Sequence, residues 1–208
     1  MITIWGRANS VNVQKVLWLC EELDLPYHRI DAGLSFGGNT EPDYLAMNPT
    51  GKIPTIVDGD FVLWESNSIL RYLAMQYGGS SPLYPPDPAD RASIDRWLDW
   101  SLSTLQPAER PVFWGIVRTP EAERDMTKLT ADVEKVAQVW KTLDMQLQGR
   151  DSIEGERFTI ADIVLGAFAK RWFGLPGIKR QSMPDLERWY QRLATRAGFK
   201  KYVDLELT

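Results

Sequence analysis

Hydrophobic positions in the first third of the chain change their period several times, as they do where strands and helices alternate. Alternating or β-branched apolar runs predict four strands, over residues 2–5, 27–30, 53–57 and 61–64. Apolar residues three and four apart predict one helix between Ser10 and Asp24 and another after Ser66, whereas residues 31–47 have an irregular or weakly helical pattern. The order βαβαββα predicts a three-layer unit built on a mixed sheet.

The chain after Pro88 has helical periodicity and no convincing strand. Two apolar stripes at three- and four-residue spacing predict long helices, and both suit a packed bundle better than a coiled coil. The first stripe contains Ile94, Trp97, Leu98, Leu102 and Leu105. The second contains Met126, Leu129, Val133, Val136, Trp140, Leu143 and Leu147. A last helix is predicted to begin near Pro184 and to end by Gly198.

A stretch rich in glycine and proline separates these two patterns. Residues 78–82, Gly-Gly-Ser-Ser-Pro, and residues 85–88, Pro-Pro-Asp-Pro, cannot continue a helix. We therefore predict an α/β domain of thioredoxin-like order over residues 1–78, a linker over 79–88 and an all-helical domain over 89–208.

The predicted helical domain contains one sharp local signature, Phe158-Thr159-Ile160-Ala161-Asp162-Ile163. Thr159 is placed to cap a helix, and Asp162 stands three residues later where a capping box usually has Glu. Phe158 and Ile163 are placed to close a hydrophobic staple. The helix that follows is apolar nearly all round, which predicts that it is buried, so we interpret this signature as structural.

Residues 48–66 contain sequence signals for a cis-proline bond, a hairpin turn and a helix start. Pro54 cannot donate a hydrogen bond within a strand, and a cis Ile53-Pro54 bond would turn the backbone N–H and C=O of Ile53 outward as an edge for an extended peptide. Asp58-Gly59 predicts a two-residue hairpin turn. Ser66 is predicted to cap the next helix, where backbone N–H groups bind carboxylates.

This stretch resembles the glutathione-binding half of the cytosolic glutathione S-transferases. The family pattern is an Asn-Pro, a short polar loop, a Val/Ile-Pro with the cis bond, a hairpin, and Glu/Gln-Ser at a helix start, and all of these occur here in order. The box at Thr159 also matches the family's core helix, so the resemblance covers nearly the whole chain. It implies that the backbone of Ile53 pairs with the cysteinyl part of glutathione and that Lys52 approaches the glycyl carboxylate. Glu65 and Ser66 would hold the γ-glutamyl end.

The same resemblance bears on three asparagines at or near the expected glutathione site. Asn39 lies where family members often place a His or Lys toward the glycyl carboxylate, and Asn12, at the start of the first helix, is a further candidate for glutathione binding. Asn67 stands where serine-type relatives often have an Arg, which weakens one expected contact with the γ-glutamyl group.

A transferase of this kind must bind glutathione as a thiolate, because the thiolate is the nucleophile and a free thiol has a pKa of about 8.5. A hydroxyl at a helix N-terminus stabilises that anion. Ser10 follows the first strand and begins the first helix, so the chain resembles the serine-type, theta-like or bacterial transferases. Ser10 could instead only cap the helix, and Asn9 or Asn12 could donate to the sulfur in its place.

The resemblance implies an electrophile pocket between the two domains, lined by apolar groups. The candidates are Arg7, Phe113, Trp114, Arg118 and Trp172, although core packing accounts equally well for the aromatic side chains. It further implies glutathione as co-substrate, a small hydrophobic electrophile, a homodimer and a role in detoxification. Glutathione-dependent isomerisation, dehalogenation or disulfide reduction stays open, as does a non-catalytic module that binds glutathione or another ligand.

Composition narrows the partners and the compartment. The formal charge of −4 argues against a nucleic-acid partner or an anionic membrane surface. One histidine and one cysteine disfavour a zinc site, so we expect no metal, and Cys20 falls on the apolar face of the first helix as a buried thiol. The chain shows neither a signal peptide nor an apolar run of roughly 18 residues, so we expect a cytoplasmic protein without a membrane span.

Overall fold

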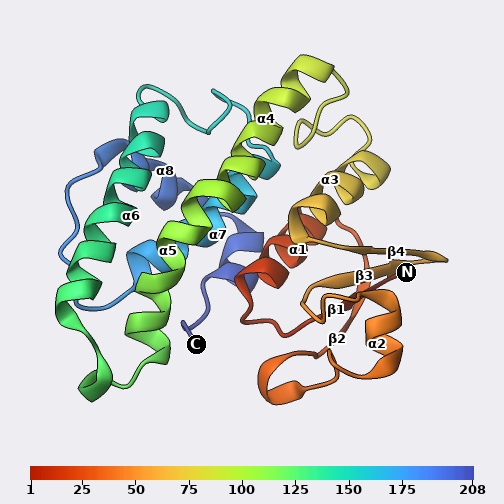
Figure 1. Cartoon of the computed structure of the whole chain (residues 1–208). Helices are drawn as coiled ribbons and strands as arrows, with labels where there is room; N and C mark the ends of the chain where they lie inside the picture. The colour runs from red at the N-terminus through yellow and green to blue at the C-terminus, as the bar shows by residue number, and fades with distance from the viewer.

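The computed structural model describes residues 1–208 and consists of an N-terminal domain built on a sheet and a C-terminal domain built of helices (Figure 1). The predicted order βαβαββα is confirmed. The N-terminal elements are β1 (Ile2–Trp5), α1 (Val11–Glu22), β2 (Tyr27–Ile30), the short 3-10 turn η1 (Leu34–Phe36), α2 (Pro42–Met47), β3 (Thr55–Asp58), β4 (Phe61–Trp64) and α3 (Ser66–Tyr77).

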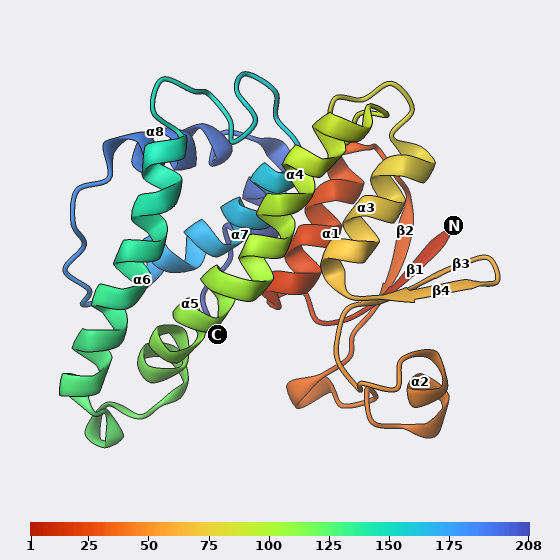
Figure 2. The ribbon, with the colours of Figure 1, turned by 45° about the horizontal axis from the view of Figure 1, so that its top comes forward.

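The four strands form one mixed sheet in the order β2-β1-β3-β4. β1 is parallel to β2 and antiparallel to β3, and β3 forms an antiparallel hairpin with β4. Ile2 and Ile4 are buried while Thr3 and Trp5 are half-buried, as the alternating pattern predicted. Helices α1 and α3 pack together on the side of the sheet that faces the helical domain, and α2 lies on the other side (Figure 2).

Two details of the hairpin differ from the prediction. β3 begins at Thr55 rather than Ile53, because Pro54 has no N–H for the ladder and pairing with β1 starts only where Thr55 lies opposite Trp5. Asp58 pairs with Phe61, so the two-residue turn consists of residues 59 and 60 rather than 58 and 59. Gly59 has a φ of +60°, a conformation that glycine adopts without strain.

The C-terminal domain contains no strand longer than isolated bridges. Its elements are α4 (Pro88–Trp100), η2 (Ser101–Leu105), α5 (Gln106–Phe113), η3 (Trp114–Arg118), η4 (Glu121–Glu123), α6 (Met126–Gln146), α7 (Ile160–Gly174), α8 (Pro184–Leu193) and η5 (Phe199–Val203). The segments η2, η3 and η5 are π-helical turns.

The predicted stripe from Ile94 to Leu105 is wrong at Leu102, which is 38% exposed. Residues 101–105 form the π-helical turn η2, and its wider i→i+5 spacing rotates the side chains away from the α-helical register. Leu105 is fully buried again. Met126, at the start of the second stripe, is also exposed, whereas Leu129 and Val133 pack against the core partly buried and the later members of the stripe are fully buried.

A further helical turn, η5, follows Gly198, where the last helix was predicted to have ended. Phe199 and Val203 are buried in η5, which packs against α1 of the N-terminal domain. The two apolar residues four apart are too short a pattern to predict this turn from the sequence.

The capping box at the start of α7 is confirmed. The Thr159 hydroxyl accepts from the Ala161 N–H, and Asp162 Oδ2 accepts from the Thr159 N–H at 2.9 Å. The helix behind it is buried along most of its length and packs against α1, α3 and α4. Helix α7 therefore connects the two domains and places α1, where the predicted thiol site begins.

Candidate active site

The predicted recognition edge at Ile53 has the expected backbone geometry. The Ile53-Pro54 peptide bond is cis, and neither the N–H nor the C=O of Ile53 makes a hydrogen bond within the chain. The preceding carbonyl, that of Lys52, accepts from the Tyr44 hydroxyl at 2.6 Å and from Asn48 Nδ2 at 2.8 Å. These buried side chains fix the loop, so the backbone of Ile53 is left free for an extended ligand.

The helix after the hairpin begins one residue earlier than predicted. Ser66 is the first residue of α3, and Glu65 holds the N-cap position with a φ of +68°. A non-glycine residue in this region is strained, and such strain is concentrated at functional sites. Ser66 is buried, and the N–H groups of the first turn have no partner within the helix. Glu65 and Ser66 therefore present an anion-binding helix end together with a carboxylate.

Ser10 is the N-cap residue of α1, but its side chain does not serve as the cap. Its backbone carbonyl accepts from the Gln14 N–H at 2.8 Å, while the hydroxyl makes no capping hydrogen bond. The residue is only 7% exposed. The simple capping role considered from the sequence is therefore wrong, because the hydroxyl remains available to a ligand at the positive end of the helix.

The two neighbouring asparagines differ in their contacts. Asn9 Nδ2 donates to the Thr208 hydroxyl near the C-terminus. The Oδ1 atoms of Asn9 and Asn12 are both buried without a hydrogen-bond partner. Buried polar atoms are usually paired, so these two unpaired oxygens make the start of α1 a candidate polar binding site.

The two predicted contacts to the glycyl carboxylate, Asn39 and Lys52, lie before and after α2, and their side chains have different partners. Asn39 Nδ2 donates to the Gly51 carbonyl at 2.6 Å, so this side chain braces the loop. Lys52 is exposed, and its ammonium group makes no hydrogen bond. Lys52 is therefore the one of the two whose side chain is free to bind a carboxylate.

The buried amino group of Lys15 lies close to the start of α3, the helix that follows Glu65. Lys15 is fully buried in α1, and its ammonium group donates to Asn67 Oδ1 at 3.0 Å. Asn67 Nδ2 in turn donates to the Leu98 carbonyl at 2.8 Å, which ties α3 to α4. Burial lowers the pKa of Lys15 to about 7, and the negative charge of Glu65 opposes that shift. Asn67 thus points into the domain interface.

The five predicted residues of the electrophile pocket fall into two groups. Phe113 and Trp172 are 3% and 1% exposed, and Trp172 stacks near Trp140, so both aromatic side chains belong to the core. Trp114 is 50% exposed between two arginines, with Arg118 at 5.9 Å from its ring centroid. Arg7 and Arg118 are half-buried.

The structure also contains a buried pair of charged residues that the sequence did not predict. Glu109 of α5 is 1% exposed, and its closest cationic atom is Arg171 Nη1 of α7 at 3.6 Å. Neither carboxylate oxygen of Glu109 makes a hydrogen bond. Burial raises the pKa of Glu109 to about 7, against the opposing charge of Arg171. No local motif announces this pair, because its members are far apart in the sequence.

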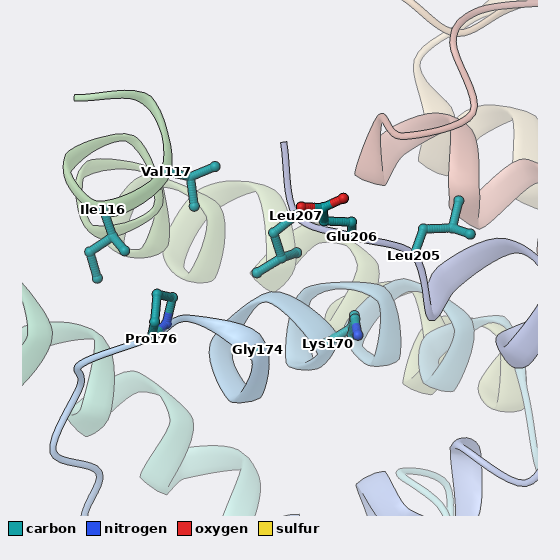
Figure 3. Close-up of a pocket in the computed structure, with 8 residues that line it drawn as sticks. All are labelled: Ile116, Val117, Lys170, Gly174, Pro176, Leu205, Glu206 and Leu207. Atoms are coloured by element: carbon teal, nitrogen blue, oxygen red, sulfur yellow. The ribbon is translucent and has the colours of Figure 1, made fainter. Parts of the chain in front are cut away.

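A pocket of about 480 Å³ lies on the helical side of this region, and Figure 3 shows the residues that line it. Ile116 and Val117 of η3 form one wall, Lys170 and Gly174 of α7 another, and residues 205–207 of the C-terminal segment a third. In both overall views the C-terminus lies close to α5 (Figures 1 and 2). The C-terminal segment thus runs along the helical wall beside the start of α1.

The only cysteine is unsuited to redox chemistry. Cys20 is 1% exposed inside α1, and burial raises the pKa of its thiol to about 12. No group of three or more His, Cys, Asp or Glu side chains is arranged to hold a metal ion. None of the helices combines the length and the apolar character that a membrane crossing requires.

Comparison with known proteins agrees with this fold. The family model for the glutathione S-transferase N-terminal domain matches residues 1–75, and that for the C-terminal domain matches residues 105–197. The chain therefore belongs to the glutathione S-transferase family, an enzyme family, as its motifs predicted.

Individual relatives extend over almost the whole chain. Glutathione S-transferase GstB of Escherichia coli is 43% identical over 205 residues, which are 98% of each chain. Glutathione S-transferase 3 of Zea mays is 29% identical over 97% of this chain and 93% of its own. The theta class glutathione S-transferase from Xanthomonas axonopodis pv. citri, solved with glutathione bound, superposes with a TM-score of 0.94 at 47% identity, covering 100% of this chain and 99% of that one.

Proposed function

We propose that this protein catalyses attack of the glutathione thiolate on an electrophilic carbon of a small compound. Residues 1–78 would bind glutathione, residues 79–88 would link the domains, and residues 89–208 would supply the electrophile pocket. The observation that carries this proposal is the Ser10 hydroxyl, which lies at the N-terminus of α1, is nearly buried and is not used as a helix cap.

Glutathione would lie along the edge formed by the loop before β3 and the start of α3. The free backbone N–H and C=O of Ile53 suit pairing with the cysteinyl part of an extended tripeptide. The helix end at Ser66 and the Glu65 carboxylate suit the carboxylate and the ammonium group of the γ-glutamyl end. Lys52 would attract the glycyl carboxylate, with Asn39 holding the loop in place.

The Ser10 hydroxyl would then donate a hydrogen bond to the sulfur and favour the thiolate, and the α1 dipole would add to this effect. Asn12 lies two residues further along α1 and would contribute a second polar contact. Asn9 is less free for this role, because its amide already donates to Thr208. In the conjugation step a carbon–sulfur bond forms and the leaving group departs with its electron pair. No step of this reaction requires a metal.

Turnover of chlorodinitrobenzene with glutathione tests this proposal. We expect wild type to be active and Ser10→Ala to lose about tenfold or more in kcat/KM at neutral pH, because one charge-assisted hydrogen bond to the nucleophile is lost. Ser103→Ala, which changes an exposed serine, is the matched control and should behave as wild type. Glutathione binding without turnover of any electrophile would instead indicate a non-catalytic module.

We also propose a cytoplasmic homodimer. Its support is a set of exposed apolar side chains on β4 and α3, namely Phe61, Met75 and Tyr77, which a second copy of the chain would cover. The single buried cysteine suits a reducing compartment. Sedimentation at micromolar concentration should give twice the mass of 23.8 kDa, and a Phe61→Glu variant should sediment as a monomer.

A further inference from the structure

Arg118 is connected through the C-terminal residue Thr208 to the loop that carries Ser10. Its Nη2 donates to the backbone oxygen of Thr208 at 2.6 Å, and the hydroxyl of the same threonine accepts from Asn9 Nδ2. One residue therefore bridges Arg118 of η3 and the immediate neighbour of Ser10. Thr208 thus lies between the guanidinium of Arg118 and the loop that carries the thiol site, and its backbone oxygen is the acceptor that Arg118 binds.

A second arginine approaches the same place from the other domain. Arg7 lies in the loop between β1 and α1, three residues before Ser10. Burial lowers the pKa of Arg7, and the positive charges of Arg118 and Arg171 lower it further. Three guanidinium groups from β1–α1, η3 and α7 thus lie close enough to repel one another.

No Asp or Glu side chain nearby compensates the charge of Arg7 or Arg118, and the acceptor that Arg118 has is the Thr208 oxygen. Glu109 lies beside Arg171 alone, and Glu65 acts on Lys15. Neither Arg7 nor Arg118 forms an ion pair with an Asp or Glu side chain. The Nε atoms of Arg7 and Arg118 are both buried and donate to nothing. Buried guanidinium donors without acceptors are costly, so they indicate a place for an anionic oxygen group.

We propose that the electrophile conjugated here carries a carboxylate, which Arg118 and Arg7 bind while the reactive carbon faces the thiol site beside Ser10. This inference rests on the proposed transferase function and replaces the hydrophobic electrophile expected from the sequence with an organic acid. The planar guanidinium group can form two parallel hydrogen bonds with the two oxygens of a carboxylate. The substrate oxygen takes the position of the Thr208 backbone oxygen, so the C-terminal segment moves aside when the acid binds.

Two matched electrophiles test the proposal. Chlorodinitrobenzoate, with chlorine para to the carboxylate, and the corresponding chlorodinitrobenzamide differ in charge and little in shape. In both, the thiolate attacks the ring carbon that bears chlorine, a carbon–sulfur bond forms, and chloride leaves with the electron pair. Each kcat/KM is divided by the rate constant of the uncatalysed reaction with glutathione, which removes the difference in intrinsic reactivity.

The wild-type enzyme should prefer the benzoate over the benzamide by about tenfold, as expected for one charge-assisted contact. Arg118→Ala should abolish this preference through a higher KM for the benzoate, with little change for the benzamide. Arg110→Ala is the matched control, since Arg110 is exposed and lies over the same Trp114 ring at 5.4 Å. Added salt should reduce the wild-type preference, because the arginines are only half-buried.

Three outcomes would overturn the proposal. The wild-type enzyme could turn over the benzamide as well as the benzoate, Arg110→Ala could lose the preference as fully as Arg118→Ala, or Arg118→Ala could raise the KM for glutathione alone. The last result would assign Arg118 to the glutathione carboxylates. If neither compound reacts while chlorodinitrobenzene does, this inference alone fails; if chlorodinitrobenzene is not turned over either, the transferase proposal itself fails.

Discussion

Two fully buried carboxylates of the helical domain have opposite surroundings. Asp162 accepts four hydrogen bonds, from the Ile153 N–H, the Trp189 indole, and the N–H and hydroxyl of Thr159. Glu109 accepts none, and its nearest cation, Arg171, is 3.6 Å away. Since burial and charge are alike, the difference lies in the hydrogen bonds. A satisfied buried carboxylate fixes the fold, whereas an unsatisfied one lies beside the proposed electrophile site.

The largest effect is expected at Asp162. Asp162→Ala leaves several buried donors without an acceptor and should lower the free energy of unfolding by about 3–5 kcal/mol, measured by urea denaturation. Asp162→Asn keeps the Oδ1 acceptor of Ile153 and Trp189 and should cost less. If both variants unfolded like wild type, the structural role given to the capping box would be wrong.

The next effect concerns Glu109 and depends on pH. Its pKa is raised in the folded protein from 4.5 to about 7, so the folded state holds its proton more tightly than the unfolded state. This contribution to stability is present below pH 4.5 and is lost as the pH rises through about 7. The loss is at most about 1.4 kcal/mol per pH unit.

Glu109→Gln removes that titration and should flatten the fall in melting temperature between pH 4.5 and about 7. Thermal melts of wild type and variant across this window provide the measurement. Identical slopes in the two proteins would contradict the assignment of an unsatisfied, partly protonated carboxyl group to Glu109.

A smaller effect is expected at the helix cap itself. Thr159→Ala removes the hydroxyl that accepts from Ala161 and should lower the free energy of unfolding by about 1 kcal/mol. Thr159→Ser keeps the oxygen and should recover most of this loss. A serine variant as unstable as the alanine variant would show that the methyl packing of Thr159, rather than its cap, matters.

The smallest effect is expected at an exposed ion pair of the same domain. Arg157 binds Asp90 through two nitrogen atoms at 2.8 and 2.9 Å, but both side chains are solvent-exposed. Arg157→Ala should leave the melting temperature unchanged within error, since exposed pairs contribute little. A clear drop would mean that hydrogen-bond geometry outweighs burial here.

Structural features that depend on short local motifs could be predicted from the sequence. Ile53-Pro54, Glu65-Ser66 and Thr159-x-x-Asp162 each carry their chemistry within a few positions, so their local geometry follows from the sequence. The one-residue error at Ser66 arose because Glu65 adopts a positive φ that its residue type does not announce. The Leu102 error arose because a π-helical turn has no simple sequence signature.

Features built from distant residues were not predictable. The Glu109–Arg171 pair joins α5 to α7, and the Lys15–Asn67 hydrogen bond joins α1 to α3. Periodicity identifies which face of a helix is apolar, but it does not say which charged residue of another helix that face will meet. For the same reason the sequence left Phe113 and Trp172 open between the pocket and the core, and only their burial places them in the core.

The central claim is that the Ser10 hydroxyl stabilises the glutathione thiolate. The most direct test is the ultraviolet absorbance of the bound thiolate as a function of pH, in wild type and Ser10→Ala. We predict that the bound thiol titrates at least one unit below the free value of about 8.5 and that Ser10→Ala moves its pKa back by about one unit. An equally low thiol pKa in Ser10→Ala would contradict the claim and assign the role to Asn12 or to the α1 N-terminus.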